Sequence, residues 1–248
     1  MTGLVEIKRG KTLLFAGVAV LGLFLVQVFA GKVGGLVANL FTYEQFDFYN
    51  LYAWISIHHF IQMIVALILL AALSKLLKAD FGFSLGDRKK GTKYLAVFLG
   101  VFAIFTLITH VLMYIYNQLP AYDFPLNSGN IMGTLGFQLF LSGTSEEILF
   151  RALPVTVLIY VCGRSVKIKG HITLEVLIAS FLFAIAHVNW SLSPFTIQAN
   201  YFQLIYAFVL GTIQGVAYQQ TGSILYPMLM HSISNVLMVG MGYLFSMI

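Results

Sequence analysis

The sequence predicts an all-α fold, a polytopic membrane helix bundle of about seven transmembrane helices, with seven to eight as the range. Three observations predict it: the composition, the length of the apolar runs and the placement of the basic residues. Of the 248 residues, 59% are hydrophobic and 9% are charged, whereas soluble domains average about 25% charged residues. A chain this apolar is typical of an integral membrane protein that is surrounded by the lipid bilayer.

The apolar runs divide the chain into candidate spans, since a transmembrane helix needs about 20 apolar residues. The fourth run is unusually long, and Gly143 and Pro154 interrupt it. Such breaks are tolerated where neighbouring helices or cavity water bind the freed backbone groups. Because no soluble segment separates the runs, we expect one integral membrane domain, with N-terminal helices in 1–130 and a core in 131–248. The predicted spans are 12–30, 50–74, 94–117, 131–162, 173–190, 201–219 and 224–245.

Lysine and arginine placement sets the expected topology, because cytoplasmic loops carry the excess of these residues. Twelve of the 14 fall in the N-terminal segment, in loop 75–93 and in loop 163–170, and the other two are Lys32 and Arg151. With seven spans, these three basic segments lie on one side of the membrane. We therefore expect the N-terminus in the cytoplasm and the C-terminus outside. The expected location is the plasma membrane of a prokaryote.

Net charge and cysteine content exclude two further features. The formal net charge is +5, but the basic residues sit between apolar runs. A nucleic-acid-binding protein would carry them as a basic patch on a soluble face, so we expect no nucleic-acid partner. Cys162 is the single cysteine of the sequence, so a disulfide within the chain is impossible.

The stretch GTSEEILFRALP, residues 143–154, places three charged side chains inside the fourth apolar run. Ionisable residues in a membrane face the bundle interior and are functional-site candidates. Glu147 and Arg151 are four residues apart, so they share a helix face and can pair. Glu146 is rotated by about 100° and can point to another partner. A buried carboxylate tuned toward neutrality suits general acid–base chemistry. The alternative is a closed ion-pair network that only fixes helix packing.

Two later spans carry polar residues at the same spacing. Phe183 and His187 are four residues apart in the fifth span, and His231 and Asn235 are four apart in the seventh. Each polar group needs a partner in lipid, so we expect Glu146 and these groups to converge on one interior cavity. The remaining histidines of the apolar runs have no carboxylate at helical spacing and are interpreted as structural or lumen-lining: His58, His59 and His110.

These motifs make the sequence recognisable. It resembles the CAAX prenyl protease type II family of intramembrane endopeptidases, also called the Abi or CPBP family, over about residues 134–240. The family's EExxxR, FxxxH and HxxxN motifs all occur in order on successive spans. They are matched by Glu146, Glu147 and Arg151, by Phe183 and His187, and by His231 and Asn235.

The resemblance implies hydrolysis of a peptide bond inside the membrane, with 131–248 as the catalytic core. Such a reaction needs an activated water, an oxyanion stabiliser and a proton donor for the leaving amine. By resemblance, Glu146 is the general base, and His187 holds or co-activates the water. His231 and Asn235 donate to the developing oxyanion.

The remaining motif residues have supporting roles by the same resemblance. Glu147 and Arg151 form a pair that sets helix orientation, and Phe183 packs beside the water site. The implied partner is a peptide or protein substrate, lipidated or embedded in the membrane, and no cofactor is expected.

Three alternatives stay open. In the first, Glu146, His187 and His231 bind zinc with a water in the open position, although the sequence has no HExxH pair. The second is a transport protein, in which intramembrane carboxylates relay protons. The third is a non-catalytic immunity protein that keeps the fold.

Depth in the membrane poses a problem for convergence. Glu146 falls near the middle of its predicted span, whereas His187 lies only a few residues from the outer end of the fifth. For the two to meet, the fifth helix must start later, tilt or be re-entrant. Glu175 favours a later start, because a carboxylate prefers the interface.

Overall fold

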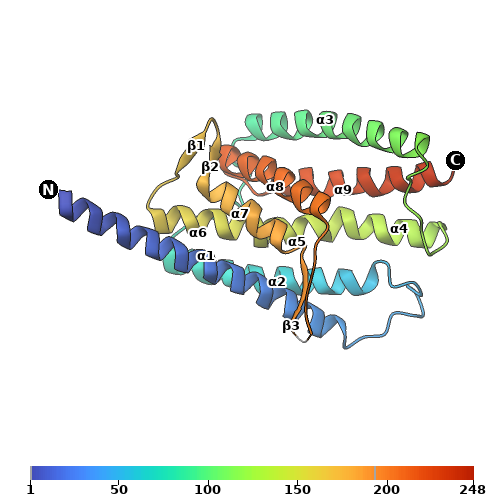
Figure 1. Cartoon of the computed structure of the whole chain (residues 1–248), viewed down its shortest axis with the longest axis horizontal. Helices are drawn as coiled ribbons and strands as arrows, with labels where there is room; N and C mark the ends of the chain where they lie inside the picture. Colours follow the sequence, from blue (N-terminus) through green and yellow to red (C-terminus); the bar gives the residue numbers. More distant parts are fainter. Residues whose placement is uncertain (1, 193) are drawn as a thin grey trace.

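The structure, a computed structural model, describes residues 2–192 and 194–248, with side chains given from residue 14 onward apart from that of residue 192. The fold is a mostly helical bundle in which the helix axes run in the same general direction. The N- and C-termini lie at opposite ends of the bundle (Figure 1). In the described residues, five helices are long and apolar enough to cross a membrane. They are α1 (Thr2–Ala38), α2 (Ala53–Leu77), α3 (Arg88–Ile115), α8 (Tyr201–Thr221) and α9 (Leu225–Ser246).

The other elements follow α3 and precede α8 along the chain. A helical run that continues from residue 128 to residue 162 passes through the middle of the bundle, and a short helix with two small hairpins follows it. The run consists of α4 (Ser128–Phe137), the π-helical segment η1 (Gln138–Ser142), α5 (Gly143–Glu147), the π-helical segment η2 (Ile148–Ala152) and α6 (Leu153–Cys162). After it come β1 (Lys167–Lys169), β2 (Ile172–Thr173), α7 (Leu174–Ile185), β3 (Asn189–Leu192) and β4 (Phe195–Gln198).

The prediction of a fifth span over 173–190 is wrong. Helix α7 has 12 residues, about 18 Å at 1.5 Å per residue, and the hydrocarbon core is about 30 Å thick. A later start is wrong too, because α7 begins at Leu174, where the side chain of Thr173 caps it by accepting from the backbone N–H of Val176. The chain then turns and forms the antiparallel β3–β4 hairpin, in which Asn189 pairs with Gln198.

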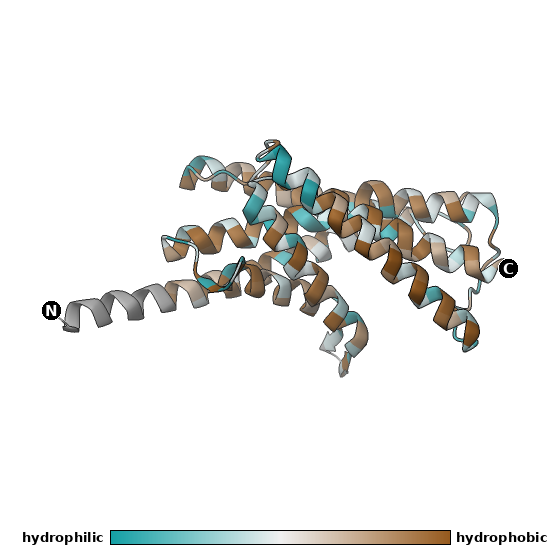
Figure 2. Cartoon of the chain, turned by 90° about the horizontal axis from the view of Figure 1, so that it is seen from above, coloured by the Kyte–Doolittle hydropathy of each residue, from teal (hydrophilic) through white to brown (hydrophobic). Residues whose placement is uncertain are grey.

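The long helices expose apolar side chains where a soluble protein would expose polar ones. On α3 the exposed residues Val97, Val101, Ile104 and Ile108 recur at helical spacing, each more than half exposed. Hydrophobic residues dominate the long helices along their length, and the connections are more hydrophilic (Figure 2). In a membrane this face contacts lipid, so its exposure does not oppose folding.

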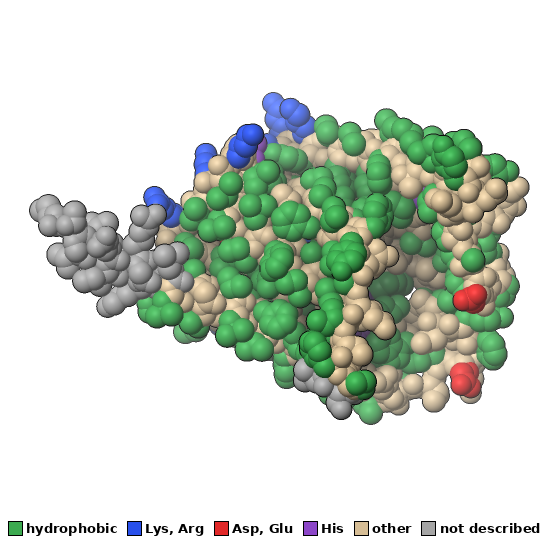
Figure 3. Space-filling model, in the orientation of Figure 1, with side chains coloured by type: hydrophobic (Ala, Val, Ile, Leu, Met, Phe, Trp, Pro, Cys, Tyr) green, Lys and Arg blue, Asp and Glu red, His purple; other side chains and the backbone are tan. Residues whose placement is uncertain are grey.

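The basic loops gather at one end of the bundle. Loops 78–87 and 163–166 lie at that end (Figure 1). On the face drawn in Figure 3, the visible Lys and Arg side chains cluster at that end and the visible Asp and Glu side chains lie at the other. The predicted N-terminal basic residues Lys8, Arg9 and Lys11 lie outside the described side chains. The described loops therefore have the one-sided arrangement expected from the sequence.

The core is centred on the run from α5 to α6. Leu149, Leu153 and Val155 are at most 1% exposed and pack with residues of α1, α2, α7 and α8 in one cluster. Two charged residues of the same run, Glu147 and Arg151, are also fully buried. The polar motif predicted from the sequence thus lies on the most enclosed helix of the molecule.

Candidate active site

Close packing of α5 against α9 brings the two glutamates to the middle of the bundle. A Cβ atom at Gly143 would lie 2.6 Å from the backbone nitrogen of Ser232, so only glycine permits this approach. Helix α5 lies between the π-helical segments η1 and η2. Such segments shift the direction of the side chains that follow and are frequent at functional sites.

Glu147 is fully buried and has two charged or polar neighbours. Its Oε1 lies 2.8 Å from Nδ1 of His231, and its Oε2 lies 3.4 Å from Nε of Arg151. The contact with Arg151 meets the distance of an ion pair but not hydrogen-bond geometry. At this distance in a low-dielectric interior, the two charges still attract strongly. Glu147 therefore links α9 to the helix that carries it.

Arg151 has contacts on two further helices. Its Nη2 donates to Oε1 of Gln214 on α8 at 2.9 Å, and its guanidinium carbon lies 3.9 Å from the ring centre of Phe183 on α7. A cation over an aromatic face is favourable, more so when both are desolvated. Arg151 thus links α7 and α8 to η2, the segment that carries it. The sequence analysis missed Gln214, which is fully buried on α8.

Glu146 points away from Arg151 and is the less buried of the two glutamates, with 16% of its side chain exposed. Its Oε2 lies 3.5 Å from Nε2 of His231, and its Oε1 lies 3.8 Å from Nδ1 of His59. These distances exceed the usual 2.7–3.2 Å of a direct hydrogen bond. The carboxylate is therefore near two imidazoles without being tied to either.

His59 on α2 is a site residue that the sequence analysis treated only as structural or lumen-lining. Its Nδ1 lies 2.8 Å from Oγ of Ser145, and that hydroxyl donates to the carbonyl of Ser142 at 3.1 Å. Because the serine proton is used there, Nδ1 of His59 is the donor of the pair, and Nε2 of the neutral ring carries the lone pair. Proximity to Glu146 comes from tertiary packing, and no motif in the sequence indicates it.

His187 lies in the turn that follows α7. Its Nδ1 donates to the carbonyl of Phe183 at 2.9 Å, so the lone pair of the neutral ring is on Nε2. The ring of Phe183 stands edge-on to His187 at 4.8 Å and to His231 at 5.8 Å. Phe183 thus separates the two imidazoles and lies under Arg151.

Asn235 lies one turn after His231 on α9 and contacts η1. Its Nδ2 donates to Oε1 of Gln138 at 2.9 Å and to Oγ of Ser142 at 3.1 Å. The sequence analysis did not identify Gln138 and Ser142, because neither belongs to a recognised motif. Both amide hydrogens of Asn235 are used in these two contacts.

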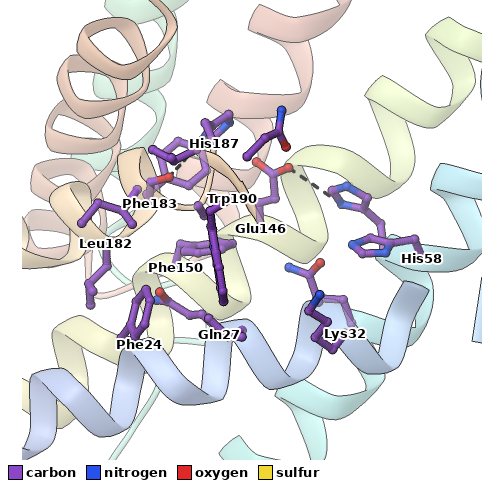
Figure 4. A pocket seen from close by; sticks show the side chains of 18 residues that line it. Phe24, Gln27, Lys32, His58, Glu146, Phe150, Leu182, Phe183, His187 and Trp190 are labelled. Carbon is purple, nitrogen blue, oxygen red and sulfur yellow. Dashed lines mark hydrogen bonds and ion pairs between the residues drawn. The ribbon is translucent and has the colours of Figure 1, made fainter. Parts of the chain in front are cut away.

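Two cavities meet at Glu146. One, of about 390 Å³, is lined by all four residues that the sequence analysis proposed as catalytic: Glu146, His187, His231 and Asn235. The other, of about 460 Å³, lies on the α1 side (Figure 4). Both cavities are lined by His59, Glu146, Phe183 and His187. The carboxylate of Glu146 is therefore accessible from two sides of the bundle.

The other histidines of the apolar runs lie elsewhere. His110 is buried on α3, and its Nδ1 donates to the carbonyl of Thr106 at 2.8 Å. His58 stacks on Trp54 with ring centres 5.2 Å apart and lines the α1-side cavity. His110 is thus structural and His58 is cavity-lining, in agreement with the sequence analysis.

In the described side-chain positions, the site does not provide a complete set of metal ligands. Glu146 and His231 are close enough to share an ion, since two zinc ligands at about 2.0–2.1 Å from the metal lie a little over 3 Å apart. No group of three or more His, Cys, Asp or Glu in the described part of the chain is placed to hold a metal ion. The zinc alternative of the sequence analysis therefore stays a prediction, and we derive no step through a metal.

The fold and the site define an integral membrane protein with a polar, carboxylate-centred cavity enclosed by its helices. Residues 128–237 match the model of the Rce1-like family, described as type II CAAX prenyl endopeptidase Rce1-like. This match confirms the family resemblance identified from the motifs, and the family is one of proteases that act on protein substrates in the membrane. Comparisons with curated proteins and with solved structures find no match. Helices α1 to α3 lie outside the matched segment, and α2 among them supplies His59.

Proposed function

We propose that this chain is a glutamic-type intramembrane endopeptidase that hydrolyses a peptide bond of a membrane-associated peptide or protein. The observation that carries the proposal is the position of Glu146. Its carboxylate is enclosed within the bundle, it lies at the junction of two cavities, and it is near His231 and His59. The substrate is a protein or peptide held in the bilayer, with or without a lipid.

Glu146 acts as general base on a water molecule that attacks the scissile carbonyl carbon. His187 is suited to hold this water, because Nδ1 of His187 is used by Phe183 and Nε2 is left to accept a hydrogen bond. Glu146 removes one proton as the water oxygen bonds to the carbonyl carbon, which gives a tetrahedral intermediate. General base catalysis of this kind contributes about 10²–10⁴ to the rate.

The negative charge of the intermediate is stabilised by His231 and Asn235. Nδ1 of His231 donates to Glu147, so protonation of Nε2 makes an imidazolium held between two carboxylates. Glu147 and Arg151 cancel in formal charge; the imidazolium is balanced by Glu146 before the attack and by the oxyanion once Glu146 has taken the proton. The buried cluster is then neutral, which low-dielectric surroundings favour. Asn235 donates to the oxyanion by exchanging its contact with Gln138 or Ser142.

Collapse of the intermediate breaks the carbon–nitrogen bond. The protonated Glu146 returns its proton to the leaving nitrogen, so the products are an amine and a carboxylic acid, and the carboxylate of Glu146 is restored. One water is consumed, and no redox partner is needed. The zinc-dependent version of this reaction would use the same substrate, and removal of the metal distinguishes it.

The membrane arrangement completes the proposal. We infer that the chain enters the membrane seven times. The run from α4 to α6 counts as one full crossing, and α7 with its hairpin counts as a partial one. The N-terminus is cytoplasmic, since the basic loops share one end of the molecule, and the membrane is the plasma membrane of a prokaryote. Residues 1–130 supply surrounding helices, and residues 131–248 form the catalytic core.

The test is peptide hydrolysis by the purified full-length protein in detergent. A farnesylated peptide and its unmodified form, each carrying a fluorophore and a quencher, report cleavage directly. We expect turnover by the wild type and loss of at least about a hundredfold in Glu146→Gln. Glu44→Gln is the matched control, since Glu44 is exposed in the loop between α1 and α2 and lines neither cavity. Full activity in Glu146→Gln would contradict the proposal.

A further inference from the structure

The α1-side cavity contains polar groups that the proposed chemistry does not use. Of its lining residues, the reaction involves Glu146 and His187, together with the neighbouring Phe183 and His59. Helix α1 contributes Gln27 and Lys32 to the same lining, and Figure 4 shows both on the α1 wall. The cavity volume of about 460 Å³ is within the range of about 300–1,000 Å³ found for ligand sites.

Lys32 is a cation inside a membrane-spanning helix. It lies six residues before Ala38, the end of α1, which is about 9 Å along the helix axis. An ionisable residue at such a depth marks a functional site, and a partner is expected. Among the described side chains, no hydrogen bond or ion pair involves Lys32. Its side chain is exposed, so a ligand in the cavity, water or a lipid phosphate can act as its partner.

Gln27 provides an independent observation that points the same way. Its side chain is 6% exposed, and its Nε2 has no hydrogen-bond partner in the described part of the chain. A buried donor without a partner is costly, and a ligand that brings an acceptor into the cavity would remove this cost. The cavity lining thus presents an unpaired cation and an unpaired amide donor on one helix.

The lining favours a negatively charged ligand group. Glu146 is the one carboxylate among the described lining residues, and it faces His231 and His59. A carboxylate matches both a lysine ammonium and an amide N–H, and hydrogen bonds between charged groups are stronger than neutral ones.

We infer that the α1-side cavity binds a carboxylate of the peptide substrate, with Lys32 as the cation and Gln27 as a second donor. The inference rests on the proposed function, because the cavity reaches the reacting group at Glu146. The carboxylate has two possible sources in a peptide: its C-terminus, or an acidic side chain close to the scissile bond. In either case Lys32 determines which peptides bind and is not itself a catalytic residue.

The experiment measures binding in the Glu146→Gln protein, so it does not depend on turnover. Three forms of one short, fluorescein-labelled, farnesylated peptide are compared by fluorescence polarisation. They are the free acid, the C-terminal amide, and the amide with one glutamate next to the scissile bond. The affinity of each peptide is measured for the Glu146→Gln protein with Lys32 intact, and for the same protein with Lys32→Met or Lys32→Arg added. Lys75→Met is the matched control. Lys75 is an exposed lysine in the last turn of α2 and does not line either cavity.

We expect the carboxylate-bearing form that matches the natural source to bind at least about tenfold more tightly than the plain amide. Lys32→Met should abolish this difference, while Lys32→Arg and Lys75→Met should keep it. Equal affinity for all three forms, binding of none, or a difference that persists in Lys32→Met would overturn the inference. Since lysine can also extend toward lipid phosphates, equal affinities would assign Lys32 to the membrane. None of these results bears on whether Glu146 is the base, which the turnover assay decides.

Discussion

Glu146 and Glu147 are adjacent in α5 but face different surroundings. Glu147 is fully buried between Nδ1 of His231 and Nε of Arg151, at 2.8 and 3.4 Å. Glu146 is turned toward the cavities, 3.5 Å from Nε2 of the same histidine. His231 therefore lies between the two carboxylates, one on each side of its ring. This geometry is the basis for proposing a supporting role for Glu147 and a reactive one for Glu146.

The first prediction concerns the stability of the two glutamate variants. Loss of Glu147 strands Arg151 in a low-dielectric interior, and breaking a buried pair typically costs about 3–5 kcal/mol. Glu146→Gln strands no partner, since Glu146 makes no direct hydrogen bond in the described structure. We expect Glu146→Gln to be inactive with near wild-type thermal stability in detergent, and Glu147→Ala to lose both activity and stability.

A double variant serves as the control for that interpretation. Glu147→Ala combined with Arg151→Leu removes the unpaired charge, so part of the lost stability should return. Equal melting temperatures for Glu146→Gln and Glu147→Ala would mean that the roles of the two carboxylates are assigned wrongly.

The second prediction concerns the contact between α5 and α9. Alanine at position 143 would place its Cβ against the backbone of Ser232, and overpacking of this kind typically costs about 1–3 kcal/mol. Gly143→Ala should therefore lower the melting temperature and also reduce activity, because the contact sets the position of Glu146. In Gly136→Ala the new Cβ meets nothing within 4 Å, so this variant should be neutral or slightly stabilising. A neutral Gly143→Ala would argue against the packing described.

The third prediction concerns His59. Its Nδ1 binds Ser145 and lies 3.8 Å from Glu146, so it positions the polypeptide beside the reactive carboxylate and adds to the local field. We expect His59→Ala to reduce kcat by about tenfold to a hundredfold, with a smaller change in KM. The matched control is His171→Ala, since His171 is exposed in the β1–β2 connection. Unchanged kcat in a folded His59→Ala protein would remove His59 from the site.

The fourth prediction concerns metal. In the proposed mechanism Glu146 activates the water directly, so treatment with a strong zinc chelator should leave peptidase activity largely intact. Loss of activity on chelation, restored by added zinc, would assign the water to a metal and support the alternative. The matching readout is the zinc content of the purified protein, which should be far below one ion per chain.

Helical spacing predicted much of the arrangement of the candidate site. Pairs four residues apart share a face, which was enough to expect Glu147 beside Arg151 and His231 in line with Asn235. It was also enough to expect the polar groups of three spans to meet, since each needs a partner in lipid. The overall class, a helical membrane bundle, followed from composition and apolar runs alone.

Other parts depended on tertiary packing that no local pattern carries. The apolar character of 173–190 suggested a full span, but the alternation of apolar and polar residues from Asn189 to Gln198 forms a hairpin that ends the helix early. This shortening places His187 within the bundle and removes the depth problem. His59 and Gln214 entered the site only through the folding of α2 and α8 onto the run from α4 to α6, and Gln138 through the contact of that run with Asn235 of α9.

The central claim is that a water molecule activated by Glu146 attacks the substrate directly. Single-turnover hydrolysis in water enriched in heavy oxygen, followed by mass spectrometry, tests it most directly. The account predicts that the new carboxyl group of the product carries heavy oxygen in the first turnover, with none incorporated into Glu146. An unlabelled first-turnover product, with the label in the side chain of Glu146, would show that this carboxylate attacks as a nucleophile and would contradict the account.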